Sequence, residues 1–235
     1  EGEQMSTVAV IGAGYVGLTT AACLAHIGHN VTCADIDETK IAQLNNGEIP
    51  IHEARLAELV QEGISKQLLK FVVGAQQAVT TSDFVFLCLP TPQGEEGRAD
   101  IGAVLEVVGE ISEIIPPQTI IITKSTVPIG TNASIQATIQ RDDVSIVSNP
   151  EFLREGVAVT DFLQPDRIVI GASDKEASER VAALYREIDA PIIEVDLASA
   201  ETIKYATNSF LATKVSFVNG LAAVREAVGA DIEAV

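Results

Sequence analysis

Residues 7–17 read TVAVIGAGYVG, and this stretch decides the fold class. Its first five residues, 7–11, are mostly apolar and predict a buried strand. Three glycines follow in a G-x-G-x-x-G pattern, and residues 15–28 then have the apolar content of a buried helix. A strand, a glycine-rich turn and a helix in this order predict the first unit of an α/β domain.

The same alternation continues along the chain. We expect further strands at 30–34, 68–73, 83–89, 119–123, 144–147, 167–171 and 191–195, and helices at 38–46, 53–62, 101–115, 129–140 and 174–187. Strands that are continuous apolar runs and are separated by helices are typical of a parallel sheet covered on both faces. We therefore predict a doubly wound, mostly parallel, Rossmann-like α/β sheet.

The last part of the chain has a different pattern. Residues 198–235 contain no proline, and apolar side chains recur at helical spacing from Ile203 to Val228. This predicts one long α-helix, and a helix of this length needs another surface to cover its apolar stripe. We therefore divide the chain into a Rossmann-like domain, residues 1–197, and the start of a long helix, residues 198–235.

Composition excludes several classes of partner. The formal net charge is −18, from 33 acidic residues against 15 lysines and arginines, so the surface repels nucleic acid and anionic membranes. No apolar run reaches the roughly 18 residues of a membrane span, and we expect a cytoplasmic protein. Cys23, Cys33 and Cys88 have apolar neighbours and no CxxC spacing, so we expect core thiols and no metal site. The four residues before Met5 are left out of the fold prediction.

The glycine motif predicts a dinucleotide site. Gly12 permits a tight turn, Gly14 lets a pyrophosphate approach the backbone, and Gly17 lets the helix pack closely on the strand. Asp35 ends the second expected strand, 18 residues after Gly17. Its carboxylate can accept from a ribose 2′-hydroxyl and repels a 2′-phosphate, so NAD is favoured over NADP. Asp37 competes for this role, and we prefer Asp35 because it directly follows the strand.

Two further patterns lie where a second ligand would bind. The segment SNPEFLREG, residues 148–156, follows an expected strand, and loops at the carboxyl ends of parallel strands line the ligand crevice. A solvated loop in which Glu and Arg pair is the alternative. Lys204 and Asn208, at i and i+4, share one helix face, where an ammonium and an amide could stabilise an oxyanion. A surface lysine beside a capping asparagine explains that pair as well.

Seven segments, in order, resemble the UDP-glucose/GDP-mannose dehydrogenase family. They are GAGYVGLTTAACLA, DIDETKI, LPTP, KSTVPIGT, SNPEFLREG, PDRIVIG and ETIKYATNSFLATKVSFVN, and the likeness runs from about Val8 to the end of the chain. PDRIVIG is more similar to the UDP-glucose branch than to the GDP-mannose branch. The resemblance implies oxidation of the C6 hydroxyl of UDP-glucose to a carboxylate, with NAD used twice, and dimerisation through the long helix.

The resemblance also implies roles for individual residues. The implied catalytic residues are Thr126, Glu151, Lys204 and Asn208. The implied cofactor-binding residues are Gly12, Gly14, Tyr15, Val16, Gly17, Asp35, Lys40, Thr91, Thr126 and Glu155. The implied substrate-binding residues are Glu151, Phe152, Leu153, Arg154, Lys204 and Asn208. Without the resemblance, Thr126 reads equally well as a cap of the next helix, and Thr91 and Lys40 as cap or surface residues.

One feature of the family has no match in these residues. The family nucleophile is a cysteine in a glycine-rich segment beyond the long helix, and a second, UDP-binding domain follows it, so we expect a truncated chain that binds NAD without turnover. Two other functions stay open: a β-hydroxyacid-type two-electron dehydrogenase, and a non-catalytic NAD-binding module. SNPEFLREG and KSTVP argue against the β-hydroxyacid type.

Overall fold

The strand before the glycine motif, β1 (Thr7–Ile11), lies inside a mixed sheet. The computed structural model describes residues 5–94, 99–229 and 231, and in these residues the sheet has eight strands in the order β3-β2-β1-β4-β5-β6-β7-β8. The other strands are β2 (Asn30–Asp35), β3 (Leu69–Val73), β4 (Phe84–Leu87), β5 (Ile120–Thr123), β6 (Ser145–Ser148), β7 (Ile168–Ala172) and β8 (Ile192–Val195). The mostly parallel, doubly wound sheet is confirmed, with β6 and β7 as its antiparallel pair.

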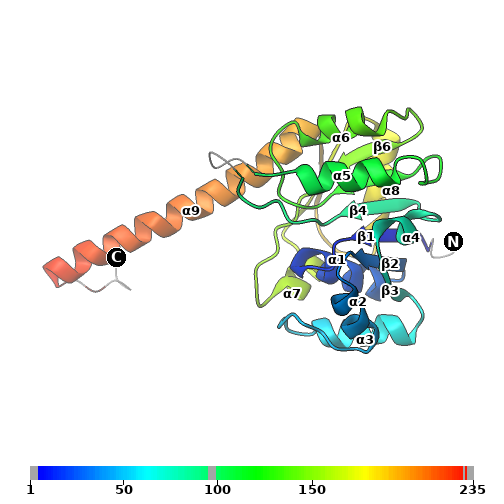
Figure 1. Ribbon diagram of the computed structural model, residues 1–235. Coiled ribbons are helices and arrows are strands. Elements are labelled where there is room, and N and C mark those ends of the chain that lie inside the picture. The colour runs from blue at the N-terminus through cyan, green and yellow to red at the C-terminus, as the bar shows by residue number, and fades with distance from the viewer. Residues whose placement is uncertain (1–4, 95–98, 230, 232–235) are drawn as a thin grey trace.

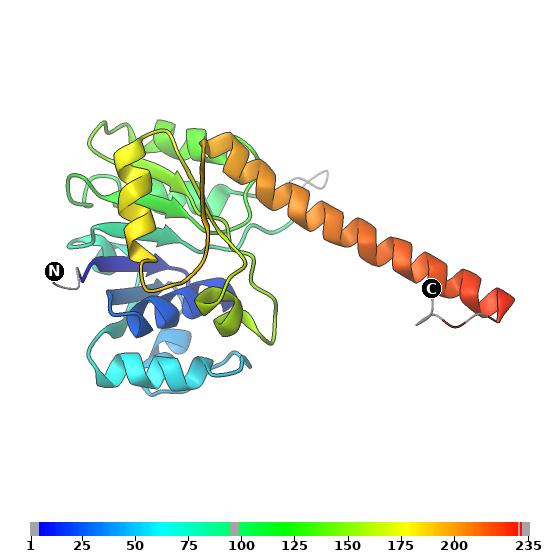
Figure 2. The ribbon, with the colours of Figure 1, turned by 180° about the vertical axis from the view of Figure 1, so that it is seen from behind.

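Helices cover both faces of the sheet (Figures 1 and 2). They are α1 (Tyr15–His26), α2 (Glu38–Asn45), α3 (Leu56–Ser65), α4 (Ala75–Val79), α5 (Gly102–Ile111), α6 (Thr131–Ile139), α7 (Ala158–Leu163), α8 (Lys175–Leu184) and α9 (Leu197–Val228). One core cluster joins the sheet to α1, α2, α3, α7 and α8, and a second joins it to α4, α5 and α6. This two-faced core explains why most strands are apolar throughout.

Three details differ from the sequence prediction. The helices α4 and α7 were not expected, because elements of five and six residues are shorter than the window in which helical periodicity is visible. The expected helix 53–62 begins only at Leu56, and Arg55 before it has a left-handed backbone, φ 66°. Glu53 therefore lies in a connecting loop. The residues before Met5 are outside the described residues.

The long helix leaves the body of the domain after its first turns (Figure 1). It has 32 residues and begins after Asp196, whose side chain accepts from Ser199 N at 2.9 Å. Its first turns pack on β7, where a Cβ on Gly171 would lie 2.4 Å from the Cβ of Ala200. Beyond them Phe210 is 72% exposed, so the expected apolar stripe is open to solvent in this chain. Within the described residues, α9 and the other helices are too short or too polar to cross a membrane.

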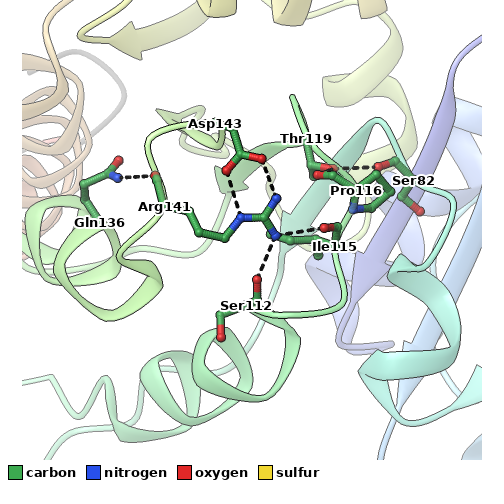
Figure 3. A network of polar contacts seen from close by, with 8 residues as sticks. All are labelled: Ser82, Ser112, Ile115, Pro116, Thr119, Gln136, Arg141 and Asp143. Atoms are coloured by element: carbon green, nitrogen blue, oxygen red, sulfur yellow. Dashed lines mark hydrogen bonds and ion pairs between the residues drawn. The ribbon is translucent and has the colours of Figure 1, made fainter.

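An arginine joins the connections at the amino ends of β5 and β6 (Figure 3). Arg141 forms a two-pronged ion pair with Asp143, through Nε at 2.9 Å and Nη2 at 2.7 Å. Its Nη1 donates to the carbonyl oxygens of Ser112 and Ile115, both at 2.9 Å. These bonds tie the end of α5 to the α6–β6 connection. They lie at the opposite edge of the sheet from the glycine motif, so they support the fold rather than the site.

Candidate active site

The glycine turn lies between β1 and α1, beside the point where the strand order reverses. Strand β1 pairs with β2 on one side and β4 on the other, which is the switch point where α/β sheets bind ligands. Gly12 has φ +99°, and a Cβ there would lie 2.6 Å from Cys88 O. A Cβ on Gly17 would lie 1.7 Å from Gly12 O, whereas one on Gly14 would meet no atom within 4 Å. Gly12 and Gly17 are therefore required by packing, and the open space at Gly14 fits a phosphate group.

Asp35 lies directly beside this turn. Its Oδ2 accepts from Ala13 N at 2.9 Å and from Lys40 Nζ at 3.0 Å, and its Oδ1 accepts from Asp37 N at 3.0 Å. Burial alone raises the pKa of the Asp35 carboxyl, but the bonds from Asp37, Ala13 and Lys40 together hold that pKa below its ordinary value. The side chain of Asp37 instead caps α2 through Thr39 N. This geometry supports Asp35, rather than Asp37, as the partner of a ribose.

A cavity of about 760 Å³ connects Asp35 to the strand ends on the other side of the turn. Its lining includes the following residues from the expected cofactor and catalytic sets: Gly12, Gly14, Tyr15, Val16, Asp35, Lys40, Thr91, Thr126 and Glu151. Its volume is typical of small-molecule and cofactor sites. Within the lining, Asp35 and Lys40 form an ion pair, and Thr91 and Thr126 are joined by a hydrogen bond. The residues present fit a dinucleotide.

Thr126 and Thr91 are joined at the end of β5. The hydroxyl of Thr91 donates to Thr126 O at 2.7 Å, and Ser125 Oγ donates to Leu89 O at 2.6 Å. These bonds hold the loops after β4 and β5 together at the cavity. Thr126 does not cap the following helix, since α6 begins five residues later and Gly130 is at its N-cap position. The alternative reading of Thr126 as a cap is therefore wrong.

Glu151 and Lys204 form a buried ion pair. Lys204 Nζ lies 2.8 Å from Glu151 Oε1 and also donates to Glu151 O at 2.5 Å, and the two side chains are only 8% and 12% exposed. Glu151 Oε2 accepts from Leu153 N at 2.7 Å. Glu151 also lines the cofactor cavity. The pair thus brings the Glu151 carboxylate of the loop after β6 together with the Lys204 ammonium of α9, at the edge of that cavity.

The other expected substrate residues are arranged less uniformly. The ring of Phe152 lies near two cations, with Lys204 Nζ and Arg167 Cζ each 5.3 Å from its centroid. Arg154 is largely exposed and forms an ion pair with Asp161 at 2.7 Å. Leu153 packs partly buried against the core.

Several of the expected site residues do not line the cavity: Gly17, Phe152, Leu153, Arg154, Glu155, Lys204 and Asn208. Glu155 lies in an exposed turn, and Asn208 is exposed on α9, one turn beyond Lys204. The shared helix face of Lys204 and Asn208 is present, but Lys204 is buried and Asn208 is not. The structure therefore joins only the first of them to the loop after β6.

A second lysine lies buried beneath the same loop. Lys124 is 5% exposed, and its Nζ donates to Asn149 Oδ1 at 3.0 Å. Burial lowers the pKa of Lys124 to about 8. Asn149 also accepts from Tyr185 and donates to Val169 O at 2.8 Å, so its side chain ties the start of the SNPEFLREG loop to β7 and to Tyr185. The sequence analysis missed Lys124, although it precedes the Ser and Thr of KSTVP.

Two acidic residues that the sequence analysis also missed hold the active-site loops. Glu201, which is 3% exposed on α9, accepts from Gly130 N at 2.7 Å and from Asn132 N at 3.0 Å at the start of α6. Glu53 accepts from Gly156 N, and from Ala158 N at 2.6 Å, at the start of α7. Both carboxylates cap helices in segments far away in the chain, and no local sequence pattern marks such a contact.

The three cysteines are free and buried, as expected. Burial raises the pKa of Cys23 and of Cys88 to about 12, and it raises the pKa of Cys33 as well. Thiols in this setting are poor nucleophiles. The described residues also contain no group of side chains that could hold a metal ion.

The fold and the cavity together define a dinucleotide-binding domain of the Rossmann type. Residues 6–189 match the NAD binding domain of the UDP-glucose/GDP-mannose dehydrogenase family, and residues 198–235 match the central domain of the same family. The chain belongs to this family, and its cofactor is NAD.

Named relatives agree with this assignment. The chain is 44% identical over 236 residues to UDP-glucose 6-dehydrogenase TuaD of Bacillus subtilis, covering 98% of this chain and 51% of TuaD. It is 42% identical to a Rickettsia felis UDP-glucose 6-dehydrogenase, covering 96% and 52%. The chain thus spans about half the length of the curated relatives it matches.

Solved structures show the same likeness. A UDP-glucose dehydrogenase from Pyrobaculum islandicum superposes with a TM-score of 0.94 at 35% identity, covering 99% of this chain and 56% of that one. A GDP-mannose dehydrogenase from Pseudomonas aeruginosa, solved as a ternary complex, has a TM-score of 0.91 at 36% identity, covering 97% and 55%. The similarity therefore extends to enzymes named for either nucleotide sugar.

Proposed function

We propose that this chain forms the NAD-binding part of a UDP-glucose 6-dehydrogenase and contributes one wall of its sugar site. The observation that carries the proposal is the buried Lys204–Glu151 pair, 2.8 Å apart, at the edge of the cofactor cavity. NAD, which the glycine turn, Asp35 and Lys40 would hold, would supply the acceptor for a hydride from the C6 carbon of the sugar. The alcohol must lose a proton at the same time, and a carboxylate paired with an ammonium is suited to handle it.

Each candidate residue has a distinct task in this proposal. Glu151 accepts or relays the C6 hydroxyl proton, and Lys204 donates to the oxygen as negative charge develops on it. Asn208 provides a second donor on the same helix face, and Thr126 positions the reacting centre against the cofactor. Phe152, Leu153 and Arg154 hold the nucleotide sugar. The resemblance assigns Glu155 to the nicotinamide end, although its side chain does not line the cavity in this chain.

The names of the relatives and the PDRIVIG segment support UDP-glucose over GDP-mannose as the substrate. The test is a titration of the chain, saturated with NAD, with each sugar nucleotide, followed by the amide NMR signals of residues 151–154. We expect UDP-glucose to shift these signals at lower concentration than GDP-mannose. The reverse order would reassign the substrate, and no shift with either sugar would contradict the proposed site.

The same samples test the two other functions. We expect the chain to bind NAD and to release no NADH steadily with UDP-glucose, because all three thiols are buried and the implied cysteine nucleophile is not among them. Steady NADH production with simple 3-hydroxyacids would instead support the β-hydroxyacid type. Binding of NAD without any response to sugar nucleotides or hydroxyacids would leave the non-catalytic module.

The exposed part of α9 supports a domain division and a partner. We propose that residues 1–197 form the NAD-binding domain. We also propose that the apolar stripe of α9 is covered by a second copy of the chain in a homodimer. Phe210, Phe217 and Val224 are 72%, 65% and 58% exposed, and burying such surface contributes about 25 cal/mol per Å². Sedimentation at high micromolar concentration should therefore show a dimer. A monomer with low binding of an apolar dye would contradict this.

A further inference from the structure

Glu53 makes a contact across the site that the proposed chemistry does not use. It lies in the connection between α2 and α3, and its two carboxylate oxygens accept from Gly156 N and Ala158 N, 103 and 105 residues further along the chain. The Ala158 bond is 2.6 Å long. Ala158 is the first residue of α7, where Val157 at the N-cap position provides no side-chain cap. Glu53 thus supplies the missing cap from another segment.

The segment that Glu53 holds is the downstream end of the SNPEFLREG loop. Its upstream end is secured by buried Asn149 and by the Glu151–Lys204 pair. At the downstream end, the described bonds of Arg154 stay within the same segment: it donates to Asp161, and its carbonyl oxygen accepts from Val157 N. Glu53 therefore makes the long-range hydrogen bonds that the structure shows for this end of the loop. They add a polar anchor to an end of the loop that α7 also holds by packing Val159 and Phe162 in the core.

The charge of Glu53 also affects Tyr15, a residue of the cofactor turn. The hydroxyl of Tyr15 is buried without a hydrogen-bond partner in the described structure, and Tyr15 lines the cofactor cavity. Desolvation, followed by the negative charge of Glu53, raises the pKa of the Tyr15 phenol. The charge of Glu53 therefore acts on one residue of the cofactor cavity, whereas the hydrogen bonds of its carboxylate go only to the end of the loop after β6 and the start of α7 in the described structure.

We propose that Glu53 is a positioning residue that holds the loop of Glu151 and Arg154 in its sugar-binding arrangement. This inference rests on the proposed function, because it assigns the loop a sugar ligand. If the Glu53 carboxylate only stabilised α7, its removal would lower the stability of the fold and would leave the affinities for NAD and for the sugar nucleotide unchanged. A positioning residue instead affects sugar affinity selectively, because Glu53 is absent from the cofactor cavity lining.

The test compares Glu53→Gln and Glu53→Ala in the 235-residue chain, with Glu48→Gln as the control. Glu48 is an exposed acid in the same connection, and the described contacts give its side chain no partner. Glutamine keeps one acceptor oxygen and loses the charge, whereas alanine loses both acceptors. NAD affinity is measured by calorimetry, UDP-glucose affinity by NMR, and the exchange of the Gly156 and Ala158 amides by hydrogen–deuterium exchange.

We expect Glu53→Ala to speed exchange of both amides about tenfold and to weaken UDP-glucose about fivefold, with Glu53→Gln intermediate. NAD affinity should change less than about twofold in both variants, as in the control. Unchanged sugar affinity or amide exchange, or an equal loss of NAD affinity, would overturn the inference. If the unaltered chain binds NAD but no nucleotide sugar, the proposed function fails. The exchange rates then show whether Glu53 holds the amides of Gly156 and Ala158 in solution, and unchanged rates would overturn the inference separately. If Glu53→Ala does not fold, the Gln variant decides the outcome.

Discussion

Lys204 Nζ lies 2.8 Å from Glu151 Oε1, although the two residues are 53 positions apart in the chain. The pair is nearly inaccessible to water and joins α9 to the loop after β6. Removing one partner of a buried pair leaves a charge without compensation. The pair is therefore expected to support the fold as well as the chemistry.

Lys204→Met should lower the free energy of unfolding by about 3 kcal/mol, because Glu151 then loses its counter-charge. Urea unfolding measures this. Lys175→Met is the matched control, since Lys175 pairs with Glu179 on the surface, with side chains 85% and 60% exposed. That change should cost less than about 0.5 kcal/mol. Equal effects in the two variants would show that the buried pair is hydrated in solution.

Asp35 should make the chain select NAD over NADP by at least about tenfold, or about 1.4 kcal/mol. The reason is that its carboxylate, held beside the glycine turn by Ala13 N and Lys40, repels a 2′-phosphate. Calorimetric titration with both cofactors tests this, and equal affinities would contradict it. Asp35→Ala should narrow the difference, although it also removes bonds to the turn, so its fold should be checked by circular dichroism.

Gly14→Val should abolish NAD binding and leave the fold intact. A Cβ at Gly14 meets no protein atom within 4 Å, so the added side chain occupies only the space predicted for the pyrophosphate. Gly17→Ala is the informative comparison, because its Cβ would lie 1.7 Å from Gly12 O and must disturb the packing of α1. Thermal unfolding and NAD titration together separate the two. Normal NAD binding by the Gly14 variant would place the phosphate elsewhere.

Lys124 should give the stability a distinctive pH dependence. Burial lowers its pKa to about 8 from an ordinary value of 10.5, so between these values the unfolded chain binds more protons than the folded one. The Lys124 contribution to stability therefore rises as pH increases through this window, by about 1 kcal/mol from pH 8 to pH 9. The buried thiols, whose pKa values are raised, act in the opposite direction above their ordinary range.

The measurement must therefore compare wild type with Lys124→Met, which contains the same thiols. Urea unfolding at several pH values should show wild type gaining stability relative to the variant between about pH 8 and pH 9. A stability difference that does not change with pH would mean that Lys124 keeps an ordinary pKa in the folded state.

Arg55→Gly should stabilise the protein by about 0.5–1 kcal/mol. Arg55 adopts φ 66° before α3, and glycine takes this left-handed backbone without the steric cost of a Cβ. Ala57→Gly, at an exposed position inside α3, should instead destabilise by about 1 kcal/mol. Thermal unfolding of both variants checks the prediction. Destabilisation by both changes would show that the backbone at Arg55 is not strained.

Local sequence was sufficient for the cofactor side of the site. Gly12 and Gly17 act through backbone conformation and close packing within one strand–turn–helix unit, Gly14 leaves open space at the turn, and Asp35 is placed by the adjacent parallel strand. Such short-range geometry depends on residue type and spacing, so the sequence predicts it. The mostly parallel sheet followed for the same reason, from continuous apolar runs that alternate with helices.

The proposed sugar side of the site was decided by tertiary structure. The pairing of Lys204 with Glu151, and the capping of distant helices by Glu201 and Glu53, each join segments more than 50 residues apart. The sequence predicted that Asn208 and Lys204 share one helix face. It did not predict that α9 leaves the domain between them, so that Lys204 is buried and Asn208 is exposed. Contacts of this kind depend on how helices pack across the sheet after the chain has crossed it several times. A carboxylate that caps a remote helix has the same local sequence as one that faces water, so only the folded chain distinguishes them.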